Sequence, residues 1–249
     1  MHQRGAERML RQLQLWDNDR SGTGWSVRES ARARRLSVRV FRSGGVEIVV
    51  PPRTSARRVS EFVRAHRDWI DGQRRRAEPL IDWPLPPQTL VFSAIGERWR
   101  CTAQAGAGGV RVKELVGGEL HISGRLHERE RLRRPLVEWL VRRAHRAFEP
   151  QLRRLAVQMA VQPQRLQVRC QRARWGSCSR RSTISLNACL LFQRPEVLRY
   201  LMVHELSHLR HMNHSERFWT LVERFEPAWK PLDAELAQGW RRVPSWILR

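Results

Sequence analysis

Apolar and polar positions alternate early in the chain. Leu36, Val38 and Val40 are separated by polar residues, and the apolar run at residues 46–50 follows a Ser-Gly-Gly turn at residues 43–45. A period of two is typical of strands with one buried face, and a glycine-rich turn between two such runs indicates a hairpin. We therefore predict a β-hairpin whose outer face is lined with arginine.

A helical pattern follows the hairpin. Pro51 and Pro52 end the second strand, and Thr54 or Ser55 can cap a helix. Apolar or aromatic residues then recur three or four positions apart, which predicts a single helix with one buried face. These residues are Val59, Phe62, Val63, His66, Trp69 and Ile70.

Beyond a proline-rich linker at residues 78–87, short strands give way to helices. Strand patterns cover residues 90–102 and 110–123, and a long helical pattern covers residues 127–160, where Pro135 and Pro150 are expected to kink or split the helix. Further strands are expected at residues 166–169 and 183–186, with a turn at residues 175–178 between them, and the last third is mostly helical.

This organisation predicts three parts. We expect a flexible tail at residues 1–23, a β-rich N-terminal domain with one helix at residues 24–124, and a catalytic domain at residues 125–249.

Composition excludes several classes of protein. The 249 residues carry 47 Lys plus Arg against 24 Asp plus Glu, a net charge of +23, which predicts non-specific affinity for polyanions, including nucleic acid. No apolar run is long enough to span a bilayer, so we predict no membrane partner. No secretory signal pattern is seen, and the four cysteines form no C-x-x-C pair. We therefore expect reduced cysteines and a cytoplasmic protein.

The density of histidine at residues 204–214, His-Glu-Leu-Ser-His-Leu-Arg-His-Met-Asn-His, indicates a metal site. Pro195 can start a helix that contains this segment. In a helix, residues four apart point about 40° apart, so His204 and His208 can bind one zinc ion. Glu205 lies on the adjoining face, where its carboxylate can act as the general base on metal-activated water.

Geometry bears on the choice of a third ligand. His211 shares a helical face with His204, but it would lie about 10.5 Å further along the axis, too far to close a tetrahedral site. Asn213 with Glu216 three residues later resembles a capping box, which predicts that a new helix starts there.

A histidine presented after such a turn can fold back over the first two ligands. We therefore prefer His214 as the third ligand, with Glu223 and Glu226 as weaker alternatives, and treat His211 as a supporting or surface residue. Three ligands and a glutamate leave a fourth position for water, which favours a catalytic over a structural zinc site.

Several motifs together resemble a known family, the YgjP-like metal-dependent hydrolases of the zincin class. They are Arg174-Trp175-Gly176-Ser177-Cys178-Ser179, Ile184-Ser185-Leu186-Asn187, Tyr200-Leu201-Met202-Val203-His204-Glu205-Leu206-Ser207-His208, and Asn213-His214-Ser215 with Phe218-Trp219.

The resemblance implies an α+β fold: a zincin-like catalytic domain with the H-E-x-x-H helix, preceded by a β-rich N-terminal part. It also implies His204, His208 and His214 as metal ligands and Glu205 as catalytic base. The family is described both as metallopeptidases and as nucleotide (UTP) pyrophosphatases.

Three functions follow from these residues. The leading hypothesis is an enzyme, a zinc-dependent hydrolase that cleaves peptide bonds through metal-activated water. A nucleotide pyrophosphatase is the first alternative, because eight arginines between residues 164 and 199 could hold phosphates. A nucleic-acid-associated protease of the SprT-like kind is the second. The eight arginines are Arg165, Arg169, Arg172, Arg174, Arg180, Arg181, Arg194 and Arg199.

The segment from Arg174 to Ser179 has two interpretations of equal weight. Its arginine and backbone N–H groups could hold an anionic or carbonyl substrate beside the metal. Alternatively it is a tight turn, in which Trp175 packs in the core and Gly176 supplies an unusual backbone angle. We do not expect Cys178 to act as a nucleophile, because metal-activated water already supplies one.

Overall fold

The computed structural model describes residues 25–41, 45–76 and 83–248, and the chain divides into two units between Leu80 and Ile81. The predicted tail at residues 1–23 and most of the predicted hairpin turn lie outside the described residues.

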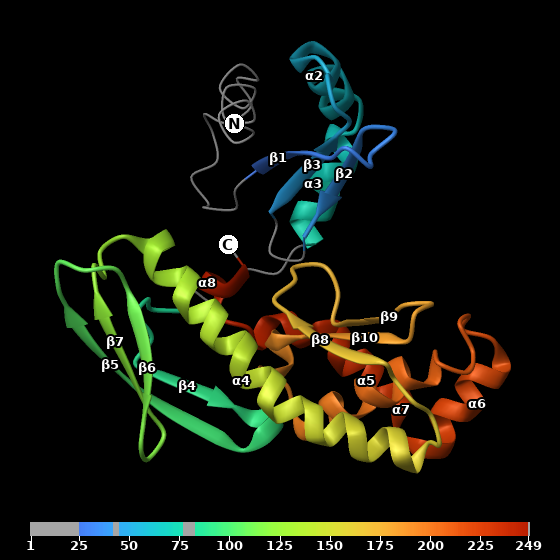
Figure 1. Cartoon of the computed structure of the whole chain (residues 1–249). Helices are drawn as coiled ribbons and strands as arrows, with labels where there is room; N and C mark the ends of the chain where they lie inside the picture. Colours follow the sequence, from blue (N-terminus) through green and yellow to red (C-terminus); the bar gives the residue numbers. More distant parts are fainter. Residues whose placement is uncertain (1–24, 42–44, 77–82, 249) are drawn as a thin grey trace. The chain divides into compact units, whose positions relative to one another are not determined.

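In the first unit, a three-stranded sheet has β3 at its centre (Figure 1). β3 runs parallel to β1 and antiparallel to β2, so the predicted pairing of the hairpin strands is confirmed. Ile48 of β3 lies opposite Val27 on one side and Val38 on the other. The elements are β1 (Trp25–Glu29), β2 (Ser37–Val40), β3 (Val46–Val50), α2 (Ala56–Ala65) and α3 (Arg67–Arg76).

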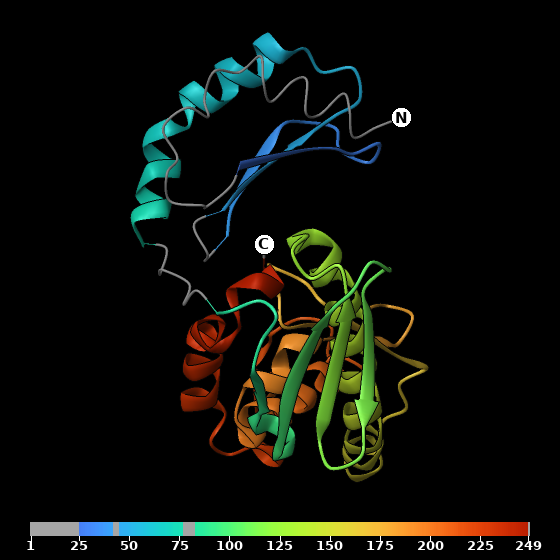
Figure 2. The same cartoon turned by 90° about the vertical axis from the view of Figure 1, so that its left-hand side faces the viewer.

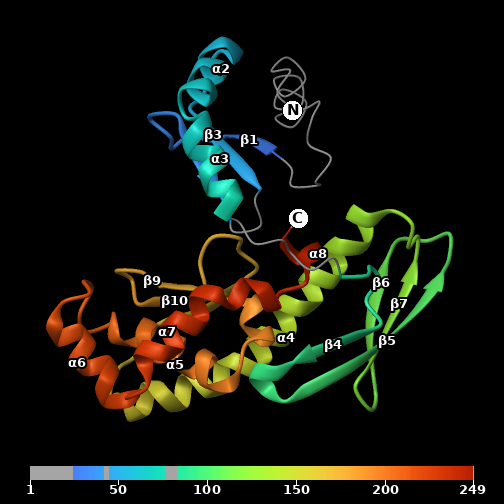
Figure 3. The same ribbon diagram turned by 180° about the vertical axis from the view of Figure 1, so that it is seen from behind.

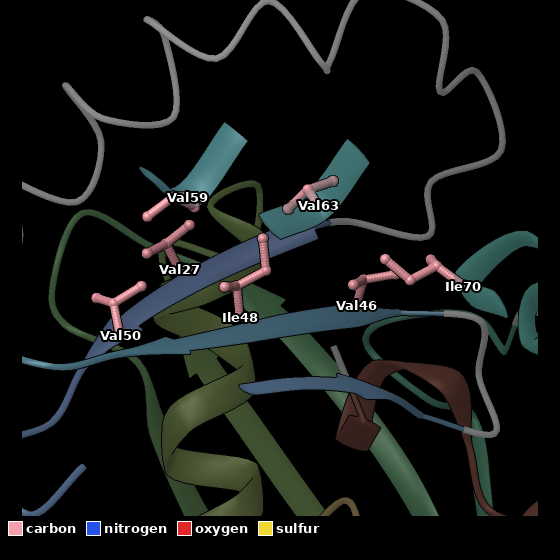
Figure 4. Packing of buried hydrophobic residues seen from close by; sticks show 7 residues of the cluster. All are labelled: Val27, Val46, Ile48, Val50, Val59, Val63 and Ile70. Atoms are coloured by element: carbon pink, nitrogen blue, oxygen red, sulfur yellow. The ribbon is translucent and has the colours of Figure 1, made fainter. Parts of the chain in front are cut away.

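One face of this sheet is covered by the two helices. Alternate residues of β3 point toward the helices, as the period of two predicts, and they meet the apolar stripe of α2 and α3 (Figure 4). The buried cluster consists of Val27, Val46, Ile48, Val50, Val59, Val63 and Ile70.

The predicted single helix is wrong, because the chain forms two helices. Ser55 caps α2 by accepting a hydrogen bond from the Arg58 amide at 3.4 Å. α2 then ends at His66, whose φ of −110° is not helical and whose Nδ1 lies 2.8 Å from the Phe62 carbonyl oxygen. The break leaves Trp69 50% exposed, whereas the apolar pattern placed it on the buried face.

The second unit begins with a four-stranded sheet in the order β4-β5-β7-β6. β5 and β7 are parallel and the outer pairs are antiparallel. Figure 2 brings this sheet to the front, with the long helix α4 behind it. The strands are β4 (Thr89–Phe92), β5 (Glu97–Ala105), β6 (Arg111–Leu115) and β7 (Glu119–Gly124).

α4 (Arg129–Gln158) is a continuous helix of 30 residues, and Pro135 and Pro150 do not split it. Its residues Leu136, Leu140 and Phe148 are fully buried. Seven Leu, Trp and Phe side chains of α4 are buried in all. At about 1.5–3 kcal/mol each, their burial together exceeds the roughly 3 kcal/mol that each interior proline costs.

Polar contacts join α4 to the preceding sheet. The Trp139 indole N–H donates to Glu114 at 2.8 Å, and the Arg143 guanidinium pairs with Glu97, with Nε 2.8 Å from the carboxylate. We predicted a domain boundary between residues 124 and 125, but the chain divides at residue 80 instead. The reason is that the sheet β4–β7 shares its packing and ion pairs with α4.

A second small sheet, in the order β8-β10-β9, lies beside α4 with the C-terminal helices (Figure 1). The turn predicted at residues 175–178 is wrong, because Gly176–Cys178 pairs with β10 as an antiparallel edge strand. No helix in the described residues combines the length and apolar character needed to cross a membrane. The elements are β8 (Arg165–Arg169), β9 (Gly176–Cys178), β10 (Thr183–Asn187), α5 (Pro195–Ser207), α6 (Glu216–Phe225), α7 (Trp229–Gln238) and α8 (Ser245–Leu248).

Candidate metal centre

The H-E-x-x-H segment lies at the C-terminal end of α5. Pro195 occupies the start of this helix, as predicted. A proline is tolerated there because the backbone N–H that it lacks would have no partner within the helix. His204 and Glu205 lie in its last turn, and His208 follows as the C-cap with φ −64° and ψ −19°. The helical spacing therefore extends to His208, and both imidazoles emerge from one end of the helix.

Three imidazoles converge there. The ligating atoms of His204, His208 and His214 all lie within 4.8 Å of one another. The Nε2 atoms of His204 and His214 are 3.1 Å apart. The structure thus brings together the three histidines that the sequence singled out.

Two of the rings have a polar partner at Nδ1, on the side that faces away from the other histidines. His208 Nδ1 lies 3.1 Å from the His211 carbonyl oxygen, so this nitrogen carries the proton and donates. His204 Nδ1 lies 3.5 Å from the Tyr200 hydroxyl. Both arrangements turn Nε2 toward the centre of the group, and a set of three imidazoles fits a zinc ion.

His214 reaches the group from the segment between α5 and α6. The predicted capping by Asn213 is wrong, because Ser215 is the N-cap residue and α6 starts at Glu216. His214 therefore precedes the helix. Its ring is exposed and stacks on Trp219 of α6, with centroids 5.6 Å apart.

The other candidate ligands lie outside this group. Glu226 pairs with Arg199, and Glu223 is exposed on α6. His211 contributes its backbone carbonyl to His208 rather than its ring.

Glu205 is buried beside the histidines. It is 4% exposed, and its Oε2 has no hydrogen-bond partner among the described residues. Burial raises the pKa of Glu205 to about 8, although the positive charge of Arg174 opposes the shift. Burial also lowers the pKa of His204 to about 3, and the neighbouring His208 and His214 add to this effect. The imidazole of His204 is therefore neutral at pH 7, as a metal ligand must be.

Gly176 of β9 lies so close to the Glu205 side chain that no residue with a Cβ atom would fit at this position. A Cβ atom added at Gly176 would lie 2.5 Å from Glu205 Oε1 and 2.9 Å from its Cδ. The role of this glycine is thus close packing of a strand against a carboxylate, not the unusual backbone angle that we considered from the sequence.

Asn187 organises the segment that leads into β9. This buried side chain donates to the carbonyl oxygens of Gln171 and Arg174, each at 2.8 Å, and accepts from the Cys189 amide at 3.0 Å. Trp175 is buried and stacks on Trp240, with centroids 3.9 Å apart. The structure therefore shows the packing role of Trp175.

Comparisons with known proteins agree with the geometry. A model of the YgjP-like family, described as "YgjP-like, metallopeptidase domain", matches residues 34–239 of the 249 residues. The chain belongs to the YgjP-like family. Membership in a metallopeptidase family implies a metal cofactor, and the three histidines are the group in the described residues that can hold one.

Other comparisons add little to this family assignment. No curated protein matches the chain. A solved structure, the metallopeptidase zymogen of Pyrococcus abyssi abylysin, is 24% identical with a TM-score of 0.35, and the match covers 39% of this chain and 97% of that one.

Some residues of this YgjP-like site escaped the sequence analysis. Tyr200 precedes His204 by four residues on α5, a spacing that could have indicated contact. Asp233, which accepts a hydrogen bond from the Tyr200 hydroxyl at 2.8 Å, carries no such local signal. Burial raises the pKa of the Cys178 thiol to about 11 and Glu205 adds to the effect, which agrees with the expectation that Cys178 is not a nucleophile.

The contact between Gly176 and Glu205 can be tested by a double-mutant cycle. We expect Gly176→Ala to destabilise the protein by about 1–3 kcal/mol, because the new methyl group overlaps the carboxylate. In a Glu205→Ala background the same substitution should cost much less. Denaturant unfolding of the four metal-free proteins measures the coupling, and equal costs in both backgrounds would disprove the contact. Ser177→Ala is the control on the same strand.

The raised pKa of Glu205 predicts a pH-dependent stability difference. The folded metal-free protein holds a proton on Glu205 up to about pH 8, whereas the unfolded chain releases it near pH 4.5. Glu205 therefore favours folding at low pH, and this contribution is lost as the pH rises toward 8. Glu205→Gln lacks this titration.

The free energy of unfolding of Glu205→Gln minus that of the wild type should therefore grow from pH 5 to pH 8. The comparison cancels the opposing effect of His204, which both proteins share. A difference that stays constant over this range would contradict the assignment.

Proposed function

We propose that this protein is a zinc-dependent hydrolase that cleaves peptide bonds. One observation carries the proposal: the ligating atoms of His204, His208 and His214 lie within 4.8 Å of one another, beside the buried and unbonded Oε2 of Glu205. Three imidazole nitrogens with a non-ligating carboxylate beside them are the donor set of a catalytic zinc site.

A zinc ion in such a site acts as a Lewis acid and lowers the pKa of water. Glu205 supplies the proton transfer, because its Oε2 has free lone pairs that can accept a proton from the attacking water. The same carboxyl group can then deliver this proton to the nitrogen of the departing amine.

The edge of β9 supports a peptide as the substrate. β9 is the outer strand of its sheet. On either side of β9, the Trp175 carbonyl accepts from the Asn187 amide of β10, and the Ser179 amide donates to the Thr183 carbonyl of β10. In an antiparallel pair, residues that bond to the partner strand alternate with residues that do not. Because Trp175 and Ser179 bond to β10, the backbone N–H and C=O groups of Gly176 and Cys178 point away from it.

These outward-facing groups belong to the strand that contacts Glu205. An extended peptide can add to such an edge as a further strand, which would bring its backbone alongside the catalytic carboxylate.

A nucleotide is less well supported than a peptide as the substrate. Phosphate binding relies on cations that converge on one ligand, but two of the eight predicted arginines are engaged elsewhere. Arg194 pairs with Glu235, and Arg199 pairs with Glu226.

Loss of Glu205 and loss of the metal should each abolish turnover, but only variants of the histidines should lose the metal. We expect Glu205→Gln to keep its bound zinc and to lose activity on an unfolded protein substrate by a factor of about 10² or more, because the general base is gone. His204→Ala should lose both zinc and activity. Zinc content and cleavage rate are measured on the same samples.

Unchanged turnover in Glu205→Gln would refute the mechanism. A parallel assay with nucleoside triphosphates decides the substrate class: chelator-sensitive release of pyrophosphate, without peptide cleavage, would replace the peptidase with a nucleotide hydrolase.

Docking on β9 predicts an alternating response to backbone methylation. Alternate residues of an added strand bond to the edge, so N-methylation of a peptide substrate should slow cleavage at every second position. Each lost hydrogen bond should raise KM by up to about tenfold. Kinetics on a set of singly methylated peptides provide the measurement, and an effect that is equal at all positions would exclude this docking mode.

A further inference from the structure

α7 contributes no metal ligand, yet it contacts the supports of two ligands. The first support is Tyr200, which is 1% exposed and donates its hydroxyl proton to Asp233 Oδ1 of α7 at 2.8 Å. Because that proton points toward Asp233, the oxygen lone pairs of Tyr200 are free to accept from His204 Nδ1 at 3.5 Å. Asp233 thereby favours the orientation in which His204 Nε2 faces the other histidines.

The second support is an aromatic stack. His214 lies on an exposed segment, and among the described residues no hydrogen bond reaches its Nδ1. Its ring instead stacks on Trp219 at an interplanar angle of 26°. Trp219 stacks in turn on Trp229 of α7, with centroids 4.1 Å apart and an angle of 18°. The ring of His214 is therefore oriented by packing.

Both supports meet on one helix. Trp229 and Asp233 are four residues apart on α7, so they lie one above the other on the same face. α7 packs against α5, as Figure 3 shows from behind. His208 differs, because its Nδ1 bonds to the His211 carbonyl within the same segment of chain.

We propose that α7 is the positioning element of the metal centre, through Asp233 and Tyr200 for His204 and through Trp229 and Trp219 for His214. The proposal rests on the function proposed above, because it assumes that the three histidines bind a metal. Outer partners of metal-bound histidines change metal affinity by about 10–100-fold. A ligand that is already oriented loses less conformational freedom when the ion binds.

Zinc affinity of the full-length protein tests the proposal. Competition with a chromophoric chelator should show about 10–100-fold weaker binding for Asp233→Ala and about tenfold weaker binding for Trp229→Leu. Trp229→Phe keeps an aromatic ring and should recover most of the affinity. The absorption spectrum of the cobalt-substituted proteins should change in the two weakened variants, because the ligand geometry changes.

Tyr200→Phe provides a second route to the same result. It removes the hydroxyl but keeps the buried ring, so it should weaken zinc binding about as much as Asp233→Ala. The double variant should bind no more weakly than either single variant, since both act through one hydrogen-bonded chain. Additive losses would overturn the proposed connection.

Glu235→Gln is the matched control on α7. Its carboxylate pairs with Arg194 and Arg242, away from the histidines. This variant should lower the melting temperature of the metal-free protein and leave zinc affinity unchanged, which separates positioning from stability.

The outcomes distinguish the two proposals. If the wild-type protein binds no zinc, the proposed function fails. If the wild type binds zinc and both Asp233→Ala and Trp229→Leu bind it equally well, the role of α7 is overturned and the metal centre stands. If Glu235→Gln weakened zinc binding as much as these two variants do, the role of α7 would also be overturned, because the loss of affinity would then reflect lower stability alone.

Discussion

Direct packing of β9 against α5 is the constraint on which the site depends. Gly176 lets the strand approach Glu205 so closely that even a methyl group would overlap the carboxylate. This approach buries Glu205, and burial sets its raised pKa. The same contact brings the free edge of β9 beside the group that we propose as the base. The proposed proton transfer and the proposed substrate docking thus share one physical origin.

Around this contact, the three histidines are held by different means. His208 depends on a backbone carbonyl nearby in the chain, whereas His204 and His214 depend on side chains from a separate helix. Such a division couples the metal centre to the packing of α7 on α5. If the three histidines bind zinc as proposed, the packing of these two helices influences zinc affinity even though α7 contributes no ligand.

Local patterns predicted several elements correctly and failed where a distant partner decided the conformation. The hairpin strands and the start of α5 at Pro195 follow from alternation and from proline chemistry. The break at His66 and the start of α6 after Ser215 were not predicted. The apolar spacing continued through His66, and Asn213 offered a second capping residue close to Ser215, so the local sequence did not fix either boundary. The strand at Gly176–Cys178 escaped because its conformation depends on pairing with β10.

The sequence by itself determined the ligand pattern. A spacing of four residues on a helix places His204 and His208 on one face, and the composition of residues 204–214 indicated a metal before any fold was known. Tertiary structure decided which third residue reaches them, how Glu205 is buried, and where the supports of the ligands come from. The physical reason is range: helical periodicity relates residues within a few positions, whereas burial and hydrogen bonding at the site join residues up to 33 positions apart.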